Sequence, residues 1–437
     1  MDPPARASKD APVASARAGP AFEVVVSSSP DADRPIFYRQ MMRRTIALVA
    51  LTAVVVFTAA ALGGTGSSTP VAVTLALSTA NVRYGDRVLA TGSLEPAVAG
   101  EEVVLELVTG GAWSQAGRAT TDASGSFAVE FQATRGGTLT AHALSSGALS
   151  EPVTLAVAPT VRVKAKPGVA FVGATVSASI SPSAYSGRVV LTVNAGGKTV
   201  ARTSARAAAG QLRATVPTPG IGRFTVVLSF PESEGFAATF AATRVSARAR
   251  TLAVGSSGPD VRALTRRLGE LRFHVPAISS TFGSALADSV IAFQKAYRLP
   301  RTGTVGPATW RMLGRARPLR ARYRGPSPHI EVDKTRQILL VVREGEVKAV
   351  LPVSSGATGN TPEGKHRIRW KALATTTWLG PAILYRTMTF YGNSFAIHGF
   401  PSVPAYPASH GCIRIPIWTA DWLYDQSPVG ETVYVYR

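Results

Sequence analysis

The chain has 437 residues, of which 46% are hydrophobic, with 40 glycines, 30 prolines and a formal net charge of +21. This length exceeds one ordinary domain, and the composition excludes both a single long helical bundle and a wholly disordered chain. The one cysteine, Cys412, excludes any intramolecular disulfide. We therefore expect a multidomain protein built mainly from small β-rich domains.

The N-terminal part carries an export signal. Residues 1–44 are rich in Ala, Pro, Ser and Asp and are expected to form a disordered cytoplasmic tail. The eighteen residues after Arg44 carry no charge, enough for a helix of about 27 Å, close to the thickness of a bilayer. Because arginines precede this stretch, the positive-inside rule predicts that the rest of the chain lies outside the cell. We predict a transmembrane helix or signal segment over residues 45–63, with a cleaved signal peptide as the alternative.

The positive charge is uneven along the chain. Residues 159–250 and residues 251–326 each carry a net charge of +10. A basic exported stretch suits an anionic bacterial envelope as partner. Nucleic acid is the other candidate, but the export signal and the sparse aromatic residues in these stretches disfavour it. A solvated basic surface without a partner remains open.

Two successive segments, residues 70–158 and 159–250, repeat one pattern of short alternating strands. Gly, Asp and Ser turns separate strands such as Val103–Val108 in the first segment and Val189–Val193 in the second. This pattern predicts two antiparallel β-sandwiches. Neither contains a cysteine pair or a histidine cluster. They resemble bacterial immunoglobulin-like spacer domains, and we assign them no chemistry.

Residues 251–316 change to helical periodicity. Apolar residues at helical spacing predict a helix that begins at Asp260 as its N-cap. Two further helices are expected near Ser284–Tyr297 and near Pro307–Leu313, where the proline suits the first helical position. Residues 317–326, with four arginines, are expected to form a basic linker.

This helical segment resembles the small peptidoglycan-binding domain family. The resemblance lies in Gly255-Ser256-Ser257-Gly258-Pro259-Asp260-Val261, in Phe282-Gly283 and in Gly303-Thr304-Val305-Gly306-Pro307-Ala308-Thr309-Trp310. Here Ser280-Thr281 stand where that family usually has Asp-Gly. The resemblance implies three helices that bind peptidoglycan, with a purely structural module as the alternative.

Residues 327–437 are predicted to form a β-rich domain that contains the candidate nucleophile. Cys412 follows Gly411, which allows a tight turn that can aim backbone N–H groups at a developing oxyanion. Arg414 is a nearby cation, which lowers the pKa of a thiol. In an extended run, His410, Cys412 and Arg414 would project to one side. A lone cysteine can also be a small buried residue, but these features favour a nucleophile.

Two histidines are candidate bases for that thiol. His410 is two residues away, a spacing that rarely brings the ring onto the sulfur without a bend. His398 lies on a preceding strand-like run with freer geometry, and we favour it. A zinc site formed by His366, His398, His410 and Cys412 competes, but no compact ligand pair is present, so we expect no metal and no cofactor.

The same residues resemble the L,D-transpeptidase catalytic domain. The motifs are Asn360-Thr361-Pro362-Glu363-Gly364-Lys365-His366, His398-Gly399 and Ser409-His410-Gly411-Cys412-Ile413-Arg414. The resemblance implies that Cys412 attacks the carbonyl of the third residue of a donor tetrapeptide stem. The terminal D-alanine leaves, and the amine of a second stem resolves the thioester into a 3→3 cross-link.

The resemblance also implies roles for the residues around Cys412. His398 is the base that takes the thiol proton, and the amides around Gly411 and Cys412 hold the oxyanion. The remaining motif residues organise the site or bind a substrate carboxylate; they are Ser409, His410, Gly399 and Arg414. Only ten residues separate His398 from Ser409, which predicts a reduced substrate-covering loop. Ala372–Arg386, with Trp378, Pro381 and Tyr385, is expected to form the opposing wall or lid, or else core.

Taken together, the sequence predicts a peptidoglycan L,D-transpeptidase on the outer face of a bacterial membrane, active in cell-wall synthesis or remodelling. Its partners would be the stem peptides and glycan of peptidoglycan, and the membrane through one N-terminal helix. An L,D-carboxypeptidase, in which water replaces the acceptor, is an alternative. A non-catalytic scaffold that binds the wall is another.

Overall fold

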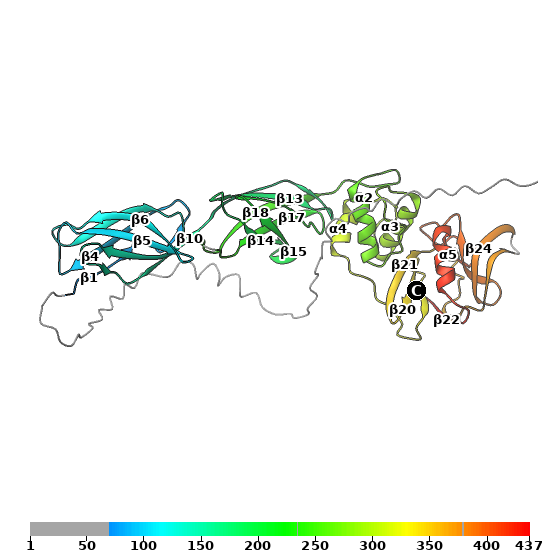
Figure 1. Ribbon diagram of the computed structural model, residues 1–437. Helices are drawn as coiled ribbons and strands as arrows, with labels where there is room; N and C mark the ends of the chain where they lie inside the picture. The colour runs from blue at the N-terminus through cyan, green and yellow to red at the C-terminus, as the bar shows by residue number, and fades with distance from the viewer. Residues whose placement is uncertain (1–69, 234, 378–379) are drawn as a thin grey trace, which may run out of the picture. The chain divides into compact units, whose positions relative to one another are not determined.

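The structure, a computed structural model, describes residues 70–437 apart from residues 234, 378 and 379. The predicted tail (1–44) and the predicted transmembrane helix or signal segment (45–63) lie outside the described residues. Within the described part of the chain, no helix is long and apolar enough to cross a membrane. The described residues are mainly β-strands, with four helices (Figure 1).

The first strands after residue 70 form two sheets around one hydrophobic core. They are β1 (Ala72–Val73), β2 (Ala76–Leu77), β3 (Asn81–Arg83), β4 (Arg87–Glu95), β5 (Glu102–Thr109), β6 (Ala112–Thr120), β7 (Ser126–Gln132), β8 (Gly137–Ala143), β9 (Ala148–Leu149) and β10 (Val153–Ala158). One sheet has the order β1-β4-β2, with β7 also paired to β4. The other has the order β3-β10-β8-β5-β6, with β9 paired to β8.

The next eight strands repeat this topology. They are β11 (Thr160–Ala165), β12 (Gly168–Val169), β13 (Ala174–Ser181), β14 (Gly187–Ala195), β15 (Lys198–Ala207), β16 (Gln211–Val216), β17 (Gly222–Phe230) and β18 (Thr239–Arg248). The sheet β12-β18-β17-β14-β15 matches β3-β10-β8-β5-β6 strand for strand, including one parallel pair in each. In β13, alternate residues from Ala174 to Ile180 are buried, the period of two that a strand with one core face requires.

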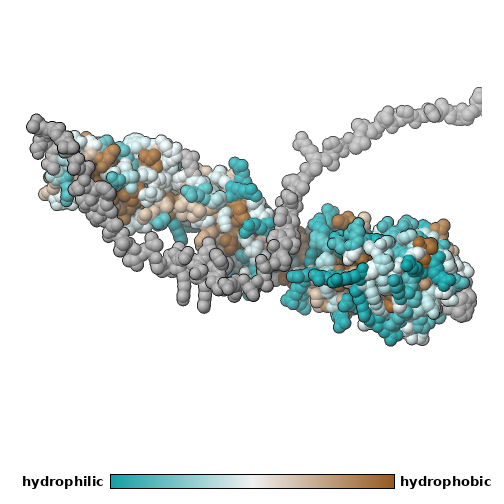
Figure 2. All heavy atoms as spheres, turned by 90° about the horizontal axis from the view of Figure 1, so that it is seen from below, coloured by the Kyte–Doolittle hydropathy of each residue, from teal (hydrophilic) through white to brown (hydrophobic). Residues whose placement is uncertain are grey.

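Some large hydrophobic side chains on the surface of these sheets are exposed. Phe240 is 77% exposed and Trp113 is 58% exposed. On the face drawn in Figure 2, hydrophobic residues are scattered among hydrophilic ones. Scattered apolar side chains of this kind are normal on a soluble protein.

Three helices follow the sheets: α2 (Pro259–Glu270), α3 (Ser284–Ala296) and α4 (Pro307–Arg315) (Figure 1). The N-cap of α2 is Gly258, with φ 138°, so the prediction of Asp260 as the cap is wrong. Pro259 occupies the first helical position because its fixed φ suits a helix, so the cap lies two residues before Asp260, at Gly258. Asp260 lies inside the helix, where its carboxylate accepts a bond of 2.7 Å from Arg250 Nε.

The C-terminal part consists of two sheets and one helix. Its elements are β19 (His329–Asp333), β20 (Ile338–Arg343), β21 (Glu346–Pro352), β22 (Gly364–Arg367), β23 (Trp370–Thr377), β24 (Gly380–Tyr391), β25 (Phe395–Phe400), β26 (Ile413–Pro416), α5 (Ile417–Gln426) and β27 (Thr432–Tyr436). The sheet orders are β21-β20-β19-β27-β22 and β23-β24-β25-β26. Glu344 and Gly345, both with positive φ, form the hairpin turn between β20 and β21.

β20 is buried on both faces, which explains its unbroken apolar sequence. Ile338, Leu340 and Val342 belong to the core formed with α2, α3 and α4. The alternate residues Leu339 and Val341 belong to the core between the two C-terminal sheets. The helices and the first C-terminal sheet therefore share one hydrophobic core, and the helices do not have a separate core of their own.

Residues 317–326 are not the free linker that their composition suggests. The backbone N–H groups of Arg322 and Tyr323 donate to the fully buried carboxylate of Glu331 at 2.9 and 2.8 Å. The Tyr323 ring stacks on Tyr434, with ring centroids 4.1 Å apart. The segment packs onto the C-terminal domain because the buried carboxylate needs donors that this segment supplies.

Candidate functional site

Cys412 lies immediately before β26, which pairs in parallel with β25. The register places His398 beside Arg414. Neighbouring residues in a sheet register share one face, so the imidazole and the guanidinium lie on the same face. The pairing therefore brings His398, from the His-Gly motif, next to the strand that follows Cys412 and contains Arg414, both from the second motif.

The Cys412 thiol is held by backbone groups of the turn that leads into β25. Its Sγ donates to the Ser394 carbonyl oxygen at 3.4 Å. Burial raises the pKa of the Cys412 thiol, while a hydrogen bond from the Ala396 backbone and the charge of Arg414 act in the opposite direction. The resting nucleophile is therefore a neutral thiol at pH 7.

His398 is prepared to accept a proton. It is 2% exposed, and its Nδ1 lies 3.0 Å from the Gly399 carbonyl oxygen. A carbonyl can only accept a hydrogen bond, so Nδ1 carries the hydrogen and Nε2 keeps its lone pair. Burial lowers the pKa of His398 to about 4, opposed by the bond to Gly399 and assisted by Arg414. The imidazole is therefore neutral, as a general base must be.

The thiol and the imidazole are not hydrogen-bonded to each other among the described residues; the thiol bonds to Ser394 instead. Catalytic hydrogen bonds are often loose in a free enzyme and form when substrate is bound. Proton transfer from Cys412 to His398 thus requires Sγ to leave the Ser394 carbonyl.

The loop that contains the nucleophile depends on a glycine. Gly411 has φ 144°, and a Cβ added there would lie 2.6 Å from Phe395 Cε1. Ser409 Oγ bridges the loop: it donates to the Cys412 carbonyl at 2.5 Å and accepts from Gly411 N–H at 3.0 Å. Because Gly411 N–H is bonded within the loop, the Cys412 N–H is the candidate oxyanion donor of the two predicted amides.

The alternation predicted one extended run that contains His410, Cys412 and Arg414. The structure does not have this run. β26 begins only at Ile413, and the positive φ at Gly411 breaks the strand before it. The His410 side chain is exposed. Arg414 is half-buried, with its guanidinium 4.4 Å from the centre of the Phe400 ring.

Gly399 supports the base by close packing. A Cβ at this position would lie 2.8 Å from Ala420 Cβ of α5. Its carbonyl is also the group that fixes the His398 tautomer. A small residue is therefore required where β25 approaches the helix.

A second segment holds the nucleophile loop, and sequence reasoning did not assign it to the site. Asn360 Nδ2 donates to the His410 carbonyl at 2.7 Å, and Thr361 Oγ1 donates to the Gly411 carbonyl at 2.7 Å. Thr361 Oγ1 also accepts from Gly356 N–H at 2.9 Å. Both residues stand in the upstream motif quoted for the family resemblance, which was the signal available.

Lys334 fixes that segment in turn. Its buried Nζ donates to the carbonyls of Gly359 and Thr361 at 2.8 and 2.7 Å and to the Glu363 carboxylate at 3.0 Å. Three acceptors satisfy the three hydrogens of one ammonium group. A lysine after a strand gives no sequence signal of such a role.

Two further expectations concern metal and the substrate lid. Across the described residues, no three His, Cys, Asp or Glu side chains converge as a metal site would require. The stretch expected to form a wall or lid, Ala372–Arg386, spans parts of β23 and β24. Tyr385 hydrogen-bonds to Asp421 of α5 at 2.8 Å, and Trp378 lies outside the described residues.

Comparison with known proteins extends over the helical and C-terminal parts. The model of the L,D-transpeptidase catalytic domain matches residues 327–435, and that of a putative peptidoglycan binding domain matches residues 257–313. The comparison with curated proteins gives no match.

Solved structures similar to this chain include an L,D-transpeptidase from Xylanimonas cellulosilytica. That similarity has 33% identity over 43% of this chain and 98% of the other, with a TM-score of 0.41. An L,D-transpeptidase from Stackebrandtia nassauensis is 22% identical over 43% of this chain and 95% of the other, with a TM-score of 0.29. One from Mycobacterium smegmatis is 14% identical over 64% and 97%, with a TM-score of 0.23.

The identity to the Xylanimonas protein, over nearly all of its length, agrees with the match of the catalytic domain model and with the motifs around Cys412. The chain therefore belongs to the L,D-transpeptidase family.

Proposed function

We propose that this protein is a cysteine acyltransferase that forms 3→3 cross-links in peptidoglycan through a thioester on Cys412. The observation that supports this proposal most is the register of β25 and β26. It pairs the neutral His398 with Arg414, which lies two residues after Cys412 in the chain. A nucleophile, a base and a cation on one sheet edge are the parts that acyl transfer requires.

In the first half-reaction, Cys412 Sγ passes its proton to His398 Nε2 and attacks the carbonyl carbon of the third residue of a donor stem. The oxyanion that forms accepts a hydrogen bond from the Cys412 N–H. When this intermediate collapses, the C–N bond to the terminal D-alanine breaks. The leaving amine takes the proton from His398, and a thioester remains on Cys412.

In the second half-reaction, the amine of an acceptor stem attacks the thioester carbonyl and gives a proton to His398. The C–S bond breaks, a new amide joins the two stems, and the thiolate recovers its proton from His398. Arg414, with its planar guanidinium, binds a substrate carboxylate or orders the site, and His410 lies at the exposed entrance.

The other parts of the chain bring this domain to its substrate. Residues 251–316 bind peptidoglycan, and the two immunoglobulin-like sandwiches over residues 70–158 and 159–250 act as spacers. The N-terminal segment anchors the protein in the bacterial cytoplasmic membrane, with the catalytic domain in the cell wall, or is removed on secretion. N-terminal sequencing of the mature protein tests this last point, since a start near residue 62 contradicts a retained anchor.

Product analysis tests the reaction. The full chain is incubated with a disaccharide-tetrapeptide, and the products are identified by mass spectrometry. The proposal predicts a cross-linked dimer together with released D-alanine. A tripeptide without dimer would instead identify an L,D-carboxypeptidase. No reaction together with binding to intact cell walls would identify a scaffold.

A further inference from the structure

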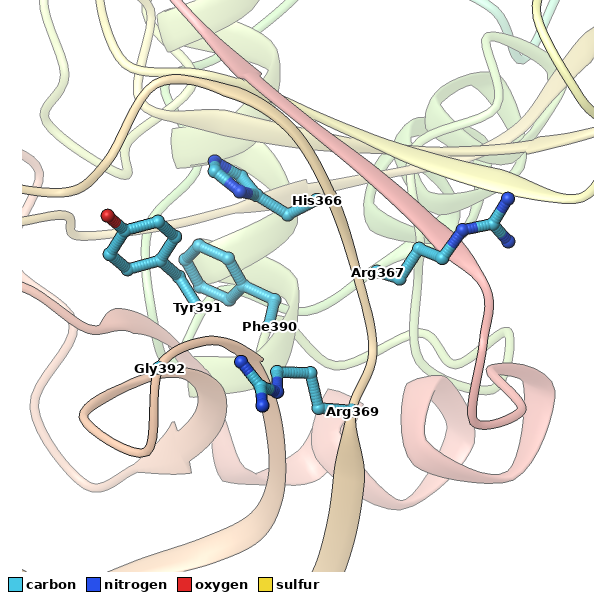
Figure 3. A pocket seen from close by; sticks show the side chains of 6 residues that line it. All are labelled: His366, Arg367, Arg369, Phe390, Tyr391 and Gly392. Atoms are coloured by element: carbon cyan, nitrogen blue, oxygen red, sulfur yellow. The ribbon is translucent and has the colours of Figure 1, made fainter.

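An open cavity of about 630 Å³ lies at the end of β24. Its walls come from β22, from the segment between β22 and β23, from the end of β24 and from the turn after it (Figure 3). The lining residues are His366, Arg367, Arg369, Phe390, Tyr391 and Gly392. None of these residues was assigned to the reaction above.

A chain of ring contacts connects this cavity with the thiol. The His366 ring lies 5.2 Å from the Tyr391 ring, which lies 5.8 Å from the Phe395 ring. Phe395 in turn packs against Gly411. The turn from Gly392 to Phe395 therefore has the cavity on one side and, through the Ser394 carbonyl, the Cys412 thiol on the other.

The lining carries positive charge and no negative charge. Both formally charged side chains in the lining are arginines. Figure 3 shows that they differ: the Arg369 guanidinium points toward the Gly392 turn, whereas that of Arg367 points away from the other labelled side chains. Arg367 Nη1 donates to the Gly430 carbonyl at 2.9 Å. Arg369 is exposed, and among the described residues its side chain has no ion-pair partner.

Two other groups in the cavity lack the partners they would normally have. His366 Nε2 is one of two buried side-chain polar atoms in the described part of the chain without a hydrogen-bond partner. A buried polar atom left unpaired is costly, so it calls for an explanation such as a bound ligand. Tyr391 is 49% exposed, and in Figure 3 its hydroxyl points away from Phe390 and Arg369. A guanidinium, an imidazole and a phenol around one opening suit an anionic ligand of carboxylate size.

We propose that this cavity is a subsite for a carboxylate of the donor stem peptide, with Arg369 as its anchor. The inference rests on the proposed function, because the ligand is the substrate that Cys412 acylates. Because Sγ contacts the Ser394 carbonyl, a donor attached to Cys412 would lie near the turn that also lines the cavity, and its carboxylates are the anionic groups nearest to the reacting carbonyl. The carboxylate comes either from the side chain of the third residue or from the second residue of the stem, and amidation of one or the other distinguishes these sources.

The test uses tetrapeptide donors that differ only in one group. One donor has free carboxylates, a second carries a carboxamide on the side chain of the third residue, and a third carries a carboxamide at the second residue. Release of D-alanine by the full chain gives kcat/KM for each. The wild type is expected to prefer the free acid over one of the two amides by about tenfold.

Arg369→Gln is expected to lose this preference. It should lower kcat/KM for the free acid by about tenfold, mainly through KM, and leave the disfavoured amide nearly unchanged. Arg367→Gln is the matched control, because its guanidinium points away, and it should keep the preference. Arg369→Lys keeps a positive charge and should retain part of the preference for the free acid. Thermal unfolding of each variant shows that the domain is intact.

Three results would overturn the inference. They are a wild type that does not distinguish acid from amide at either position, an Arg369→Gln variant that slows all donors equally, and an effect confined to the acceptor step. Failure of the proposed function looks different, since the wild type would then release no D-alanine from any donor.

Discussion

At the scale of single residues, the protonation states of Cys412 and His398 suit the proposed proton transfer from thiol to imidazole when substrate binds. Burial favours the uncharged form of both Cys412 and His398, so the resting pair is thiol and imidazole. A preformed thiolate–imidazolium pair would instead need the opposite shifts. Sγ rests on the Ser394 carbonyl, which keeps the proton on sulfur.

This state predicts how the thiol reacts with a small alkylating agent. Labelling of the free enzyme by iodoacetamide should be slow at pH 7 and should keep rising above about pH 8.5, because only the thiolate reacts. Cys412 is the only cysteine, so intact mass reports this site alone. A rate that is already at its plateau below pH 7 would contradict the neutral pair.

Gly411 gives a second prediction. Gly411→Ala should lower turnover by on the order of 100-fold or more, because the new methyl group meets the Phe395 ring and the loop must move. The measurement is D-alanine release together with thermal unfolding.

Gly345→Ala is the control for Gly411→Ala. Gly345 also has positive φ, at 76°, but has open space around its Cβ and lies in the distant hairpin. This variant should lose about 1 kcal/mol of stability and keep its turnover. Equal turnover in the two variants would show that the loop does not need its glycine.

The individual chemistry-bearing residues could be predicted from sequence better than their surroundings. Cys412, Gly411 and His398 stand in short motifs, so their residue types carried the signal. The geometry of the site could not be predicted from these motifs. The hydrogen bond from Cys412 to Ser394 and the tautomer of His398 depend on backbone carbonyls, whose positions no motif specifies.

At the scale of elements, the nucleophile loop is held by the segment before β22. Thr361 Oγ1 accepts from Gly356 N–H and donates to the Gly411 carbonyl, so one hydroxyl joins two loops. Lys334, at the end of β19, holds the same segment through two of its carbonyls. The position of the thiol therefore depends on the first C-terminal sheet as well as on β25 and β26.

Removing this hydroxyl should loosen the loop. Thr361→Val leaves two buried backbone groups unpaired and should destabilise the domain by about 2 kcal/mol or more. Turnover should fall further than the loss of folded protein explains. Thr361→Ser keeps the hydroxyl and should behave nearly as the wild type. If calorimetry and D-alanine release find Thr361→Val unchanged, the loop is positioned by other contacts.

Elements with strong periodicity were predictable and those with tertiary causes were not. The helices near Ser284 and Pro307 follow their apolar spacing and were found. The cap of α2 was wrong by two residues because Pro259 outranks Asp260 at the helix start. α5 was not predicted from the sequence. It begins directly after a strand that ends in Pro416 and has no capping side chain that would mark a helix start.

At the scale of the whole molecule, the helical part and the first C-terminal sheet are joined by a shared core and by hydrogen bonds. Lys295 of α3 is fully buried, and its Nζ donates to the Val353 carbonyl at 2.8 Å. The next residue, Ser354, exchanges two backbone hydrogen bonds of 3.0 Å with Arg414. These bonds connect α3 with Arg414 through Val353 and Ser354.

The same interface predicts a loss of stability in acid. His274 is stacked between Trp418 and Trp422, and burial lowers its pKa to about 4. The unfolded chain binds this proton near pH 6.5 and the folded protein only near pH 4, so stability falls as pH drops through that range. For His274 alone the loss is between about 1 and 3 kcal/mol.

His274→Phe keeps a stacked ring and removes the titration. The quantity to measure by calorimetry is the unfolding temperature of His274→Phe minus that of the wild type. This difference should be more positive at pH 4.5 than at pH 7. If the difference between the two proteins is the same at both pH values, His274 does not titrate in this range.

The composition predicted a multidomain protein but not how its parts pack together. The shared core of β20 could not be read from its sequence, because an unbroken apolar strand fits any sheet that is covered on both faces. The segment 317–326 was taken for a linker since its arginines suggest solvent, whereas its backbone binds Glu331.

The central claim is that a donor stem becomes covalently attached to Cys412. The most direct measurement is intact-protein mass spectrometry of the full chain, quenched in acid soon after mixing with a tetrapeptide donor and no acceptor. The account predicts a mass gain equal to the donor minus D-alanine, located on the peptide that contains Cys412 and absent in Cys412→Ala. An adduct on another residue, or D-alanine released by Cys412→Ala at the wild-type rate, would contradict it.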